Sequence, residues 1–361
     1  MPDVSADSPV VAARVPAGSL AAFTTLRLGG PPGRLVSAVD SDTIVQTVRE
    51  CARRGEPVLV LAGGSNVVIS DAGFPGTVAL IRSRGLRVLA EDTGSVTVRV
   101  EAGEPWDEVV RTAVAAGWSG LECLSGIPGS AGATPIQNVG AYGQEVAETI
   151  TAVRAYDRLA DTVVTLAPAD CGFVYRGSIF KYADRWVVLS VDFRLARTPL
   201  SAPIRYAELA RALGVETGDR VPLARARKAV LALRGRKGMV LDPADPDTYS
   251  VGSFFTNPVL GAPAYGELLV RADGLGEPVA WPGQDGTVKV SAAWLIERAG
   301  FGRGYGLGDV AISTKHTLAL TNRGNGTATA LLALAAEIRD GVRDRFGVVL
   351  HPEPVLVNCS L

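Results

Sequence analysis

A long irregular segment, SGIPGSAGATPIQNVGAYG at residues 125–143, constrains the fold more than any other feature of this sequence. It contains five glycines and two prolines and has neither helical nor strand periodicity. A segment of this length without regular structure inside a globular chain is usually a binding loop or a disordered one. Its isoleucine, valine and tyrosine residues argue against disorder, so we expect a binding loop.

The composition limits the classes of protein to which the chain can belong. Its 361 residues suggest two or three domains, and 47% hydrophobic with 20% charged residues indicates a soluble chain with a large core. The net charge of −1 gives no electrostatic footprint for nucleic acid or for an anionic membrane. No apolar run reaches the roughly 18 residues that span a bilayer, and the first ten residues do not resemble a signal peptide. Four scattered cysteines predict neither disulfides nor a zinc site, so we expect a reduced, cytoplasmic enzyme.

The hydrophobic pattern predicts mixed helices and strands. A strand at 34–40, a helix at 41–55 and a strand at 58–62 form a βαβ-like start. Further strands and one amphipathic helix follow as far as residue 195, and helices dominate beyond it. We therefore expect a domain boundary near residue 200.

Several standard motifs are missing or occur in the wrong context. Gly306, Gly308 and Ala311 have the spacing of a dinucleotide-binding fingerprint, but they follow a glycine-rich stretch and precede a predicted strand. There is no P-loop, no G-x-S-x-G elbow and no H-E-x-x-H. A lone His351 and Glu353 near the end of the chain are more often structural than metal ligands, so no metal site is expected.

Two glycine-rich turns offer unobstructed backbone N–H groups, which suit a pyrophosphate. Each alone is as readily explained as a tight turn, whereas together they could hold a large cofactor between two lobes. The first turn comprises Ala62, Gly63, Gly64, Ser65 and Asn66. The second comprises Gly126, Ile127, Pro128, Gly129, Ser130, Gly132, Ala133, Gln137, Asn138, Gly140, Ala141, Tyr142 and Gly143.

Six segments, in order between about residues 23 and 357, resemble the UDP-N-acetylenolpyruvoylglucosamine reductase family. They are GGSN, the segment 125–143, YRGSIFK at 175–181, GSFFTNP at 252–258, KVSAAWLI at 289–296 and HPE at 351–353. The resemblance implies FAD as cofactor and NADPH as hydride donor. The implied reaction is reduction of an enolpyruvyl ether on UDP-N-acetylglucosamine to a lactyl ether, in peptidoglycan precursor synthesis.

The resemblance also implies the fold, which is of the α+β class. It predicts a two-lobed, PCMH-like FAD-binding domain at 20–200 and a smaller α/β substrate-binding domain at 201–345. Residues 346–361 should return to the first lobe, and residues 1–19 should form a flexible extension.

Ser253 has no histidine nearby, since the chain contains only His316 and His351. A serine without a base is a poor nucleophile, and GSFF also fits an ordinary packed strand. The resemblance instead implies that Ser253 is a general acid, protonating the carbon beside the substrate carboxylate after hydride addition. Arg176 would stabilise the developing charge on that carboxylate. Glu353 matches the family's C-terminal catalytic glutamate.

Substrate binding should depend on cations because UDP carries two phosphates. Lys237 and Lys289 are the candidates for this role, with help from Asn257. Tyr175 is a further candidate, and Tyr206 resembles the tyrosine of a loop that closes over the substrate in one branch of the family. NADPH and the sugar nucleotide would use the same cleft in turn.

Two other functions remain open at the level of sequence. An FAD-dependent oxidase of an alcohol or sugar would explain both glycine-rich turns but not Ser253, Arg176 and Glu353. A catalytically inactive sugar-nucleotide-binding regulator would bind nucleotide without a flavin. A UDP-sugar is the only partner that the sequence indicates, and we expect a monomer with no membrane, nucleic-acid or protein partner.

Overall fold

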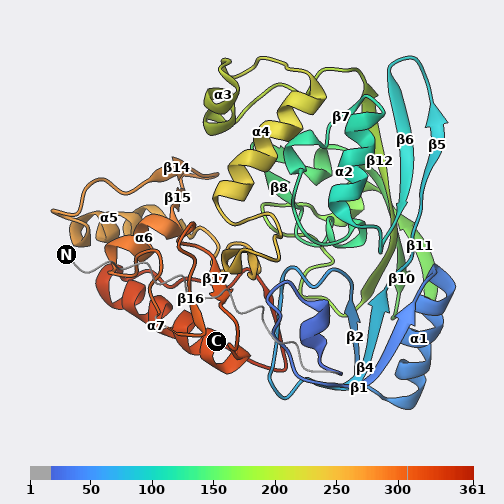
Figure 1. Cartoon of the computed structure of the whole chain (residues 1–361), viewed down its shortest axis with the longest axis horizontal. Coiled ribbons are helices and arrows are strands. Elements are labelled where there is room, and N and C mark those ends of the chain that lie inside the picture. Colours follow the sequence, from blue (N-terminus) through green and yellow to red (C-terminus); the bar gives the residue numbers. More distant parts are fainter. Residues whose placement is uncertain (1–17, 307) are drawn as a thin grey trace, which may run out of the picture. The chain divides into compact units, whose positions relative to one another are not determined.

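The computed structural model describes residues 18–306 and 308–361, so most of the extension predicted for residues 1–19 lies outside the described residues. The chain divides into two compact units (Figure 1). The N-terminal unit is formed by Pro31–Ser65 and Phe74–Val240. The C-terminal unit combines Leu241–Leu361 with Asn66–Gly73 and with the described residues up to Gly30.

A three-stranded parallel sheet of order β1-β4-β2 begins the N-terminal unit. Helix α1 connects β1 to β2. Asp40 accepts a hydrogen bond from the Thr43 N–H at its start, and it ends at Gly55, whose φ is 64°. The elements are β1 (Pro32–Ala38), α1 (Ser41–Arg54), β2 (Val58–Leu61) and β4 (Phe74–Ile81).

The largest sheet also belongs to the N-terminal unit and has the order β11-β10-β12-β6-β5, with β7 paired to β12. Helix α2 (Trp106–Ala115) packs on it through Trp106, whose ring centre lies 5.7 Å from that of Phe193 on β12. The strands are β5 (Leu86–Glu91), β6 (Ser95–Glu101), β7 (Trp118–Ser119), β10 (Ile150–Asp157), β11 (Thr162–Leu166) and β12 (Trp186–Arg197).

Helices α3 (Ala207–Leu213) and α4 (Leu223–Arg236) complete the N-terminal unit. They bury a small apolar cluster that includes Leu209, Val230 and Cys123. The division at residue 240 therefore differs from the domain boundary expected near residue 200. The change from strands to helices marks a change of secondary structure, whereas the core to which a helix belongs is set by contacts distant in sequence.

The C-terminal unit has three small sheets and three helices around one apolar cluster. The sheets have the orders β13-β15-β14, β16-β17 and β18-β3. The strands are β3 (Val67–Ile69), β13 (Val259–Leu260), β14 (Ala280–Pro282), β15 (Val288–Val290), β16 (Val310–Ile312), β17 (Leu320–Asn322) and β18 (Val355–Val357). The helices are α5 (Ala262–Arg271), α6 (Ala292–Arg298) and α7 (Ala328–Phe346).

Two details of this unit bear on the sequence analysis. The end of the chain pairs β18 with β3 in parallel, and β3 directly follows the first glycine-rich turn. Gly306 and Gly308 precede strand β16 rather than a helix, which agrees with rejecting a dinucleotide fingerprint there. Among the described helices, none has the length and apolar content that a membrane span requires.

Candidate active site

The two glycine-rich turns touch each other within the N-terminal unit. A β-carbon added to Gly63 would lie 2.5 Å from the Cα of Gly129, so only glycine permits this approach. Gly129 itself has a φ of 116°, and its carbonyl accepts a hydrogen bond from the Trp106 N–H at the start of α2. The two turns, which the sequence predicts to hold one cofactor together, therefore lie against each other.

The second turn retains a polar atom without a partner. The Ser130 hydroxyl is buried and has no hydrogen-bond partner among the described residues. A buried hydroxyl without a partner costs free energy, so it marks a place where a ligand acceptor would be stabilised. The same unit contains the other predicted cofactor residues of the turns, except Asn66: Ala62, Gly64, Ser65, Gly126, Ile127, Pro128, Gly132, Ala133, Gln137, Asn138, Gly140, Ala141, Tyr142 and Gly143.

An acidic side chain that was not predicted holds the start of the second turn. Asp107 accepts a hydrogen bond of 2.5 Å from the Gly126 N–H, and Arg227 on α4 donates two bonds of 2.7 Å to the same carboxylate. Burial raises the pKa of Asp107, but the bonds from Arg227 and Gly126 outweigh it, so the net pKa lies below its usual value. Asp107 thereby fixes Gly126 to both α2 and α4.

Three residues near the end of the second turn adopt left-handed backbone conformations although none is glycine. They are Asn138 (φ 44°), Tyr142 (φ 50°) and Arg176 (φ 54°). Such conformations cost of order 1–3 kcal/mol each and are common at binding sites. All three were predicted as cofactor-binding or catalytic residues.

Side-chain bonds stabilise this arrangement. The Asn138 amide donates to the carboxylate of Glu145 at 2.8 Å, and the Arg176 guanidinium donates to the Gly140 carbonyl at 2.8 Å. The guanidinium carbon also lies 5.1 Å from the ring centre of Tyr175. The structure therefore brings Arg176 and Tyr175 to the same loop as the predicted cofactor residues.

Tyr142 also meets two predicted substrate residues. Its ring packs edge-to-face against Tyr206, with ring centres 5.6 Å apart, and the Lys237 Nζ lies 6.0 Å from its ring centre. Lys237 forms an ion pair of 2.7 Å with Glu208, a residue that the sequence analysis did not single out. Burial raises the pKa of Tyr142 to about 12.

In the C-terminal unit, main-chain pairing brings Ser253 and Glu353 together. The Glu353 N–H donates to the Phe254 carbonyl at 2.8 Å, and Phe255 forms an antiparallel bridge with Pro352. The Asn66 amide also donates to the Glu353 carbonyl, at 3.4 Å. Two predicted catalytic residues, 100 positions apart, thus lie on adjacent backbone segments beside the last residue of the first turn.

Asn257 and Lys289 occupy neighbouring positions in the same unit. The Asn257 side chain accepts a hydrogen bond of 2.9 Å from the Ala292 N–H at the start of α6. Lys289 is paired with Val259 and with Trp281 across the sheet, and its Nζ lies 5.7 Å from the Trp281 ring centre. Trp281 was not predicted, because its exposed aromatic ring belongs to no motif.

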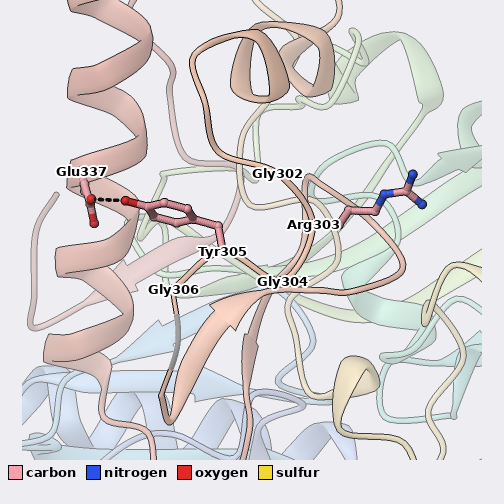
Figure 2. Close-up of a pocket in the computed structure, with 6 residues that line it drawn as sticks. All are labelled: Gly302, Arg303, Gly304, Tyr305, Gly306 and Glu337. Carbon is pink, nitrogen blue, oxygen red and sulfur yellow. Dashed lines mark hydrogen bonds between the residues drawn. The ribbon is translucent and has the colours of Figure 1, made fainter. Parts of the chain in front are cut away.

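A hollow of about 530 Å³ lies elsewhere in the C-terminal unit. Figure 2 shows the residues around it. It is lined by Gly302, Arg303, Gly304, Tyr305, Gly306 and Glu337. The Tyr305 hydroxyl bonds to the Glu337 carboxylate at 2.5 Å, while Arg303 extends away from this pair. None of the predicted site residues lines this hollow. In the described part of the chain, no three metal-binding side chains gather into a possible metal site.

Two family models match this chain. A model described as FAD binding domain matches residues 32–166, and one described as UDP-N-acetylenolpyruvoylglucosamine reductase, C-terminal domain, matches residues 243–357. The first match covers both glycine-rich turns, and the second covers Ser253, Asn257, Lys289 and Glu353. The predicted FAD cofactor and the class of FAD-containing oxidoreductase are confirmed.

Known proteins similar to this chain are named UDP-N-acetylenolpyruvoylglucosamine reductase. The reductase of Salinispora arenicola is 69% identical over 346 residues, which are 95% of each chain. The reductase of Thermobifida fusca is 58% identical, and the alignment covers 95% of this chain and 97% of that protein. A crystal structure of the Thermus caldophilus enzyme matches with a TM-score of 0.63 and 24% identity, covering 96% of this chain and 99% of that one.

The structural match confirms the predicted α+β fold class with its FAD-binding and C-terminal domains. The resemblance inferred from six short segments extends over nearly the whole chain. The chain belongs to the UDP-N-acetylenolpyruvoylglucosamine reductase family.

Proposed function

We propose that this chain reduces UDP-N-acetylglucosamine enolpyruvate to UDP-N-acetylmuramate, with NADPH as the reductant. Family membership supports the substrate, because relatives that align with 95% of this chain are named for it. The observation that carries the proposal is the main-chain pairing of the Ser253 and Glu353 segments. Neither alternative function requires these two segments to pair.

The two glycine-rich turns fit a bound FAD. Gly63 and Gly129 have no side chains to obstruct the backbone N–H groups of the turns, which would suit a pyrophosphate. The buried Ser130 hydroxyl would gain the hydrogen-bond partner that it lacks among the described residues. When bound, FAD would accept a hydride from NADPH and supply it to the substrate.

Ser253 would act as the general acid. Hydride addition to the terminal methylene carbon leaves an enolate-like centre next to the substrate carboxylate. A neutral serine hydroxyl can protonate such a basic centre without help from a histidine. General-acid catalysis of this kind contributes roughly 10²–10⁴-fold to the rate.

Arg176 and Glu353 would act on the substrate carboxylate. Arg176 has a fixed fork of donors, one of which already bonds to Gly140, so its guanidinium is oriented before substrate arrives. Glu353, held through its main chain by Phe254 and Asn66, would polarise the carboxylate or orient a water molecule.

The remaining polar residues would bind the sugar nucleotide. Lys237 and Lys289 supply positive charge for the diphosphate, with Asn257 as a further donor and Tyr175 as a further contact. Tyr206 would close over the substrate. The shared cleft for NADPH and substrate, the cytoplasmic location and the monomeric state remain predictions from the sequence.

An anaerobic experiment tests this function. The holoenzyme is reduced with NADPH, UDP-N-acetylglucosamine enolpyruvate is added, and the flavin's visible absorbance is followed. We expect the oxidised spectrum to return at a rate sufficient for turnover. A flavin that stays bleached until air is admitted would indicate an oxidase and would refute the proposed substrate.

A further inference from the structure

A half-buried ion pair joins two helices next to the predicted substrate residues. Lys237, the C-cap residue that follows α4, lies 2.7 Å from the carboxylate of Glu208 in the first turn of α3. The two side chains are 36% and 34% exposed. Solvent can therefore reach the pair, and so can a dissolved anion.

The pair contacts the aromatic residues of the loop. The Lys237 Nζ lies 6.0 Å from the Tyr142 ring centre, at the limit of a cation–π contact. Tyr142 packs in turn against Tyr206, which lies two residues before Glu208. The carboxylate of Glu208 also disfavours ionisation of the Tyr142 phenol, adding to the effect of burial on its pKa. Glu208, Lys237, Tyr142 and Tyr206 thus form one cluster within the N-terminal unit.

Tyr206 lies between two attachments to neighbouring segments. On one side, Arg205 donates to the Glu148 carboxylate at 2.9 Å and to the Gly143 carbonyl at 3.4 Å. On the other side, Glu208 is bonded to Lys237. These side-chain bonds of the residues on either side restrain the main chain at Tyr206. Only the second involves a candidate phosphate-binding residue.

We propose that Glu208 competes with the diphosphate of the sugar nucleotide for Lys237, and that their exchange releases the segment carrying Tyr206. This inference rests on the proposed function. A diphosphate bound to the Lys237 ammonium would lie within a few ångströms of Glu208, and like charges at about 4–6 Å repel each other. The ion pair must therefore open, and its opening removes one of the two attachments beside Tyr206.

Glu208 would accordingly be a specificity-determining residue. It keeps Lys237 neutralised until an anion with enough charge displaces the carboxylate. A neutral sugar would leave the ion pair closed, whereas a sugar linked to a diphosphate would open it. Lys237 thus couples recognition of the diphosphate to movement of Tyr206.

The test uses the oxidised holoenzyme and its Glu208→Gln variant, titrated with UDP-N-acetylglucosamine while the flavin absorbance is recorded. Glutamine keeps the shape of the side chain but cannot compete as an anion. We expect binding to tighten by about threefold to tenfold, with a faster association rate. Glu208→Ala should change both values in the same direction, which provides a second variant if the first folds poorly.

Two comparisons separate this role from a structural one. Glu108 also lies in the first turn of a helix and pairs with an arginine, at 2.6 Å from Arg111, so Glu108→Gln is a matched control that should bind normally. In a Lys237→Met background, Glu208→Gln should give no gain in affinity. Weaker or unchanged binding by Glu208→Gln, beside normal binding by the wild type, would overturn the inference alone. Failure of the wild type to bind UDP-N-acetylglucosamine or to reduce its enolpyruvyl ether would overturn the inference and the proposed function together.

Discussion

Ser253 and Arg176, two of the residues proposed to act directly on the reacting group, are held in different ways. Around Ser253 the holding bonds belong to the main chain: the Phe254 N–H donates to Leu318, and the Phe254 carbonyl accepts from Glu353. The Phe254 and Phe255 side chains are buried, with ring centres 5.1 Å apart. The serine side chain takes no part in any of these bonds.

Arg176 is held partly by its own side chain. Its backbone is left-handed, its guanidinium donates to Gly140, and its carbonyl accepts a bond of 3.1 Å from Lys181. Replacing this side chain therefore changes both the chemistry and the local structure. A substitution at Ser253 should change only the chemical step, whereas one at Arg176 should change both the chemical step and the local structure.

The largest effect is expected for Ser253→Ala. Reduction of the flavin by NADPH should stay near the wild-type rate, while reduction of the enolpyruvyl substrate should slow by roughly 10²–10⁴-fold because the general acid is lost. Stopped-flow absorbance measures the two half-reactions separately. Equal slowing of both would show that Ser253 supports the structure rather than protonating the substrate.

Gly63→Ala tests how closely the two glycine-rich turns must approach. The added methyl group would lie 2.5 Å from the Gly129 Cα and would force the turns apart. Overpacking of this kind costs about 1–3 kcal/mol, so FAD affinity should fall by roughly tenfold to hundredfold. Flavin content after extensive dialysis gives the readout.

Gly266→Ala is the matched control for this substitution. Gly266 lies inside helix α5, and an added β-carbon there would meet no atom within 4 Å. Flavin content should be unchanged, and stability should rise by about 0.5–1 kcal/mol. Normal FAD binding by Gly63→Ala would mean that the turns can separate without affecting the cofactor.

Arg176→Lys should have a smaller effect than removal of the general acid. Lysine retains the positive charge but cannot bond to Gly140 and to a substrate carboxylate with one fixed fork. We expect reduction of the substrate to slow by roughly tenfold, with reduction by NADPH unaffected. Reoxidation by substrate at the normal rate would refute the role assigned to Arg176.

The sequence predicted the parts of the site that have local signatures. Glycine-rich turns identified Gly63 and Gly129, and the contact between them follows from their shared lack of side chains. The ion pairs Lys237–Glu208 and Arg227–Asp107 could not be predicted, because their members lie 29 and 120 positions apart. No sequence pattern distinguishes Glu208 or Asp107 from the other acidic residues of the chain. The division at residue 240 differs from the expected boundary for the same reason, since the cluster that includes α3 and α4 is completed by Cys123.

Asp107→Asn should have the smallest effect. It tests whether side-chain bonds hold the N-terminal unit, as they hold Arg176. Asparagine loses the negative charge that pairs with Arg227, and it keeps only one of the two oxygens that accept from Arg227 and Gly126. Because the carboxylate is about a third exposed, we expect a loss of only about 1 kcal/mol in the free energy of unfolding near neutral pH. Urea denaturation of the holoenzyme provides the measurement.

The pH dependence of that loss follows from the direction of the pKa shift. The pKa of Asp107 is lowered in the folded protein, so its contribution is present above the unfolded pKa of about 4 and is lost as pH falls through the lower folded value. The difference between wild type and Asp107→Asn should thus stay constant from about pH 7 to about pH 4 and shrink below that. A difference that vanished already near neutral pH would show that the Asp107 carboxylate does not hold the turn. The N-terminal unit would then rely on main-chain bonds, as the surroundings of Ser253 do.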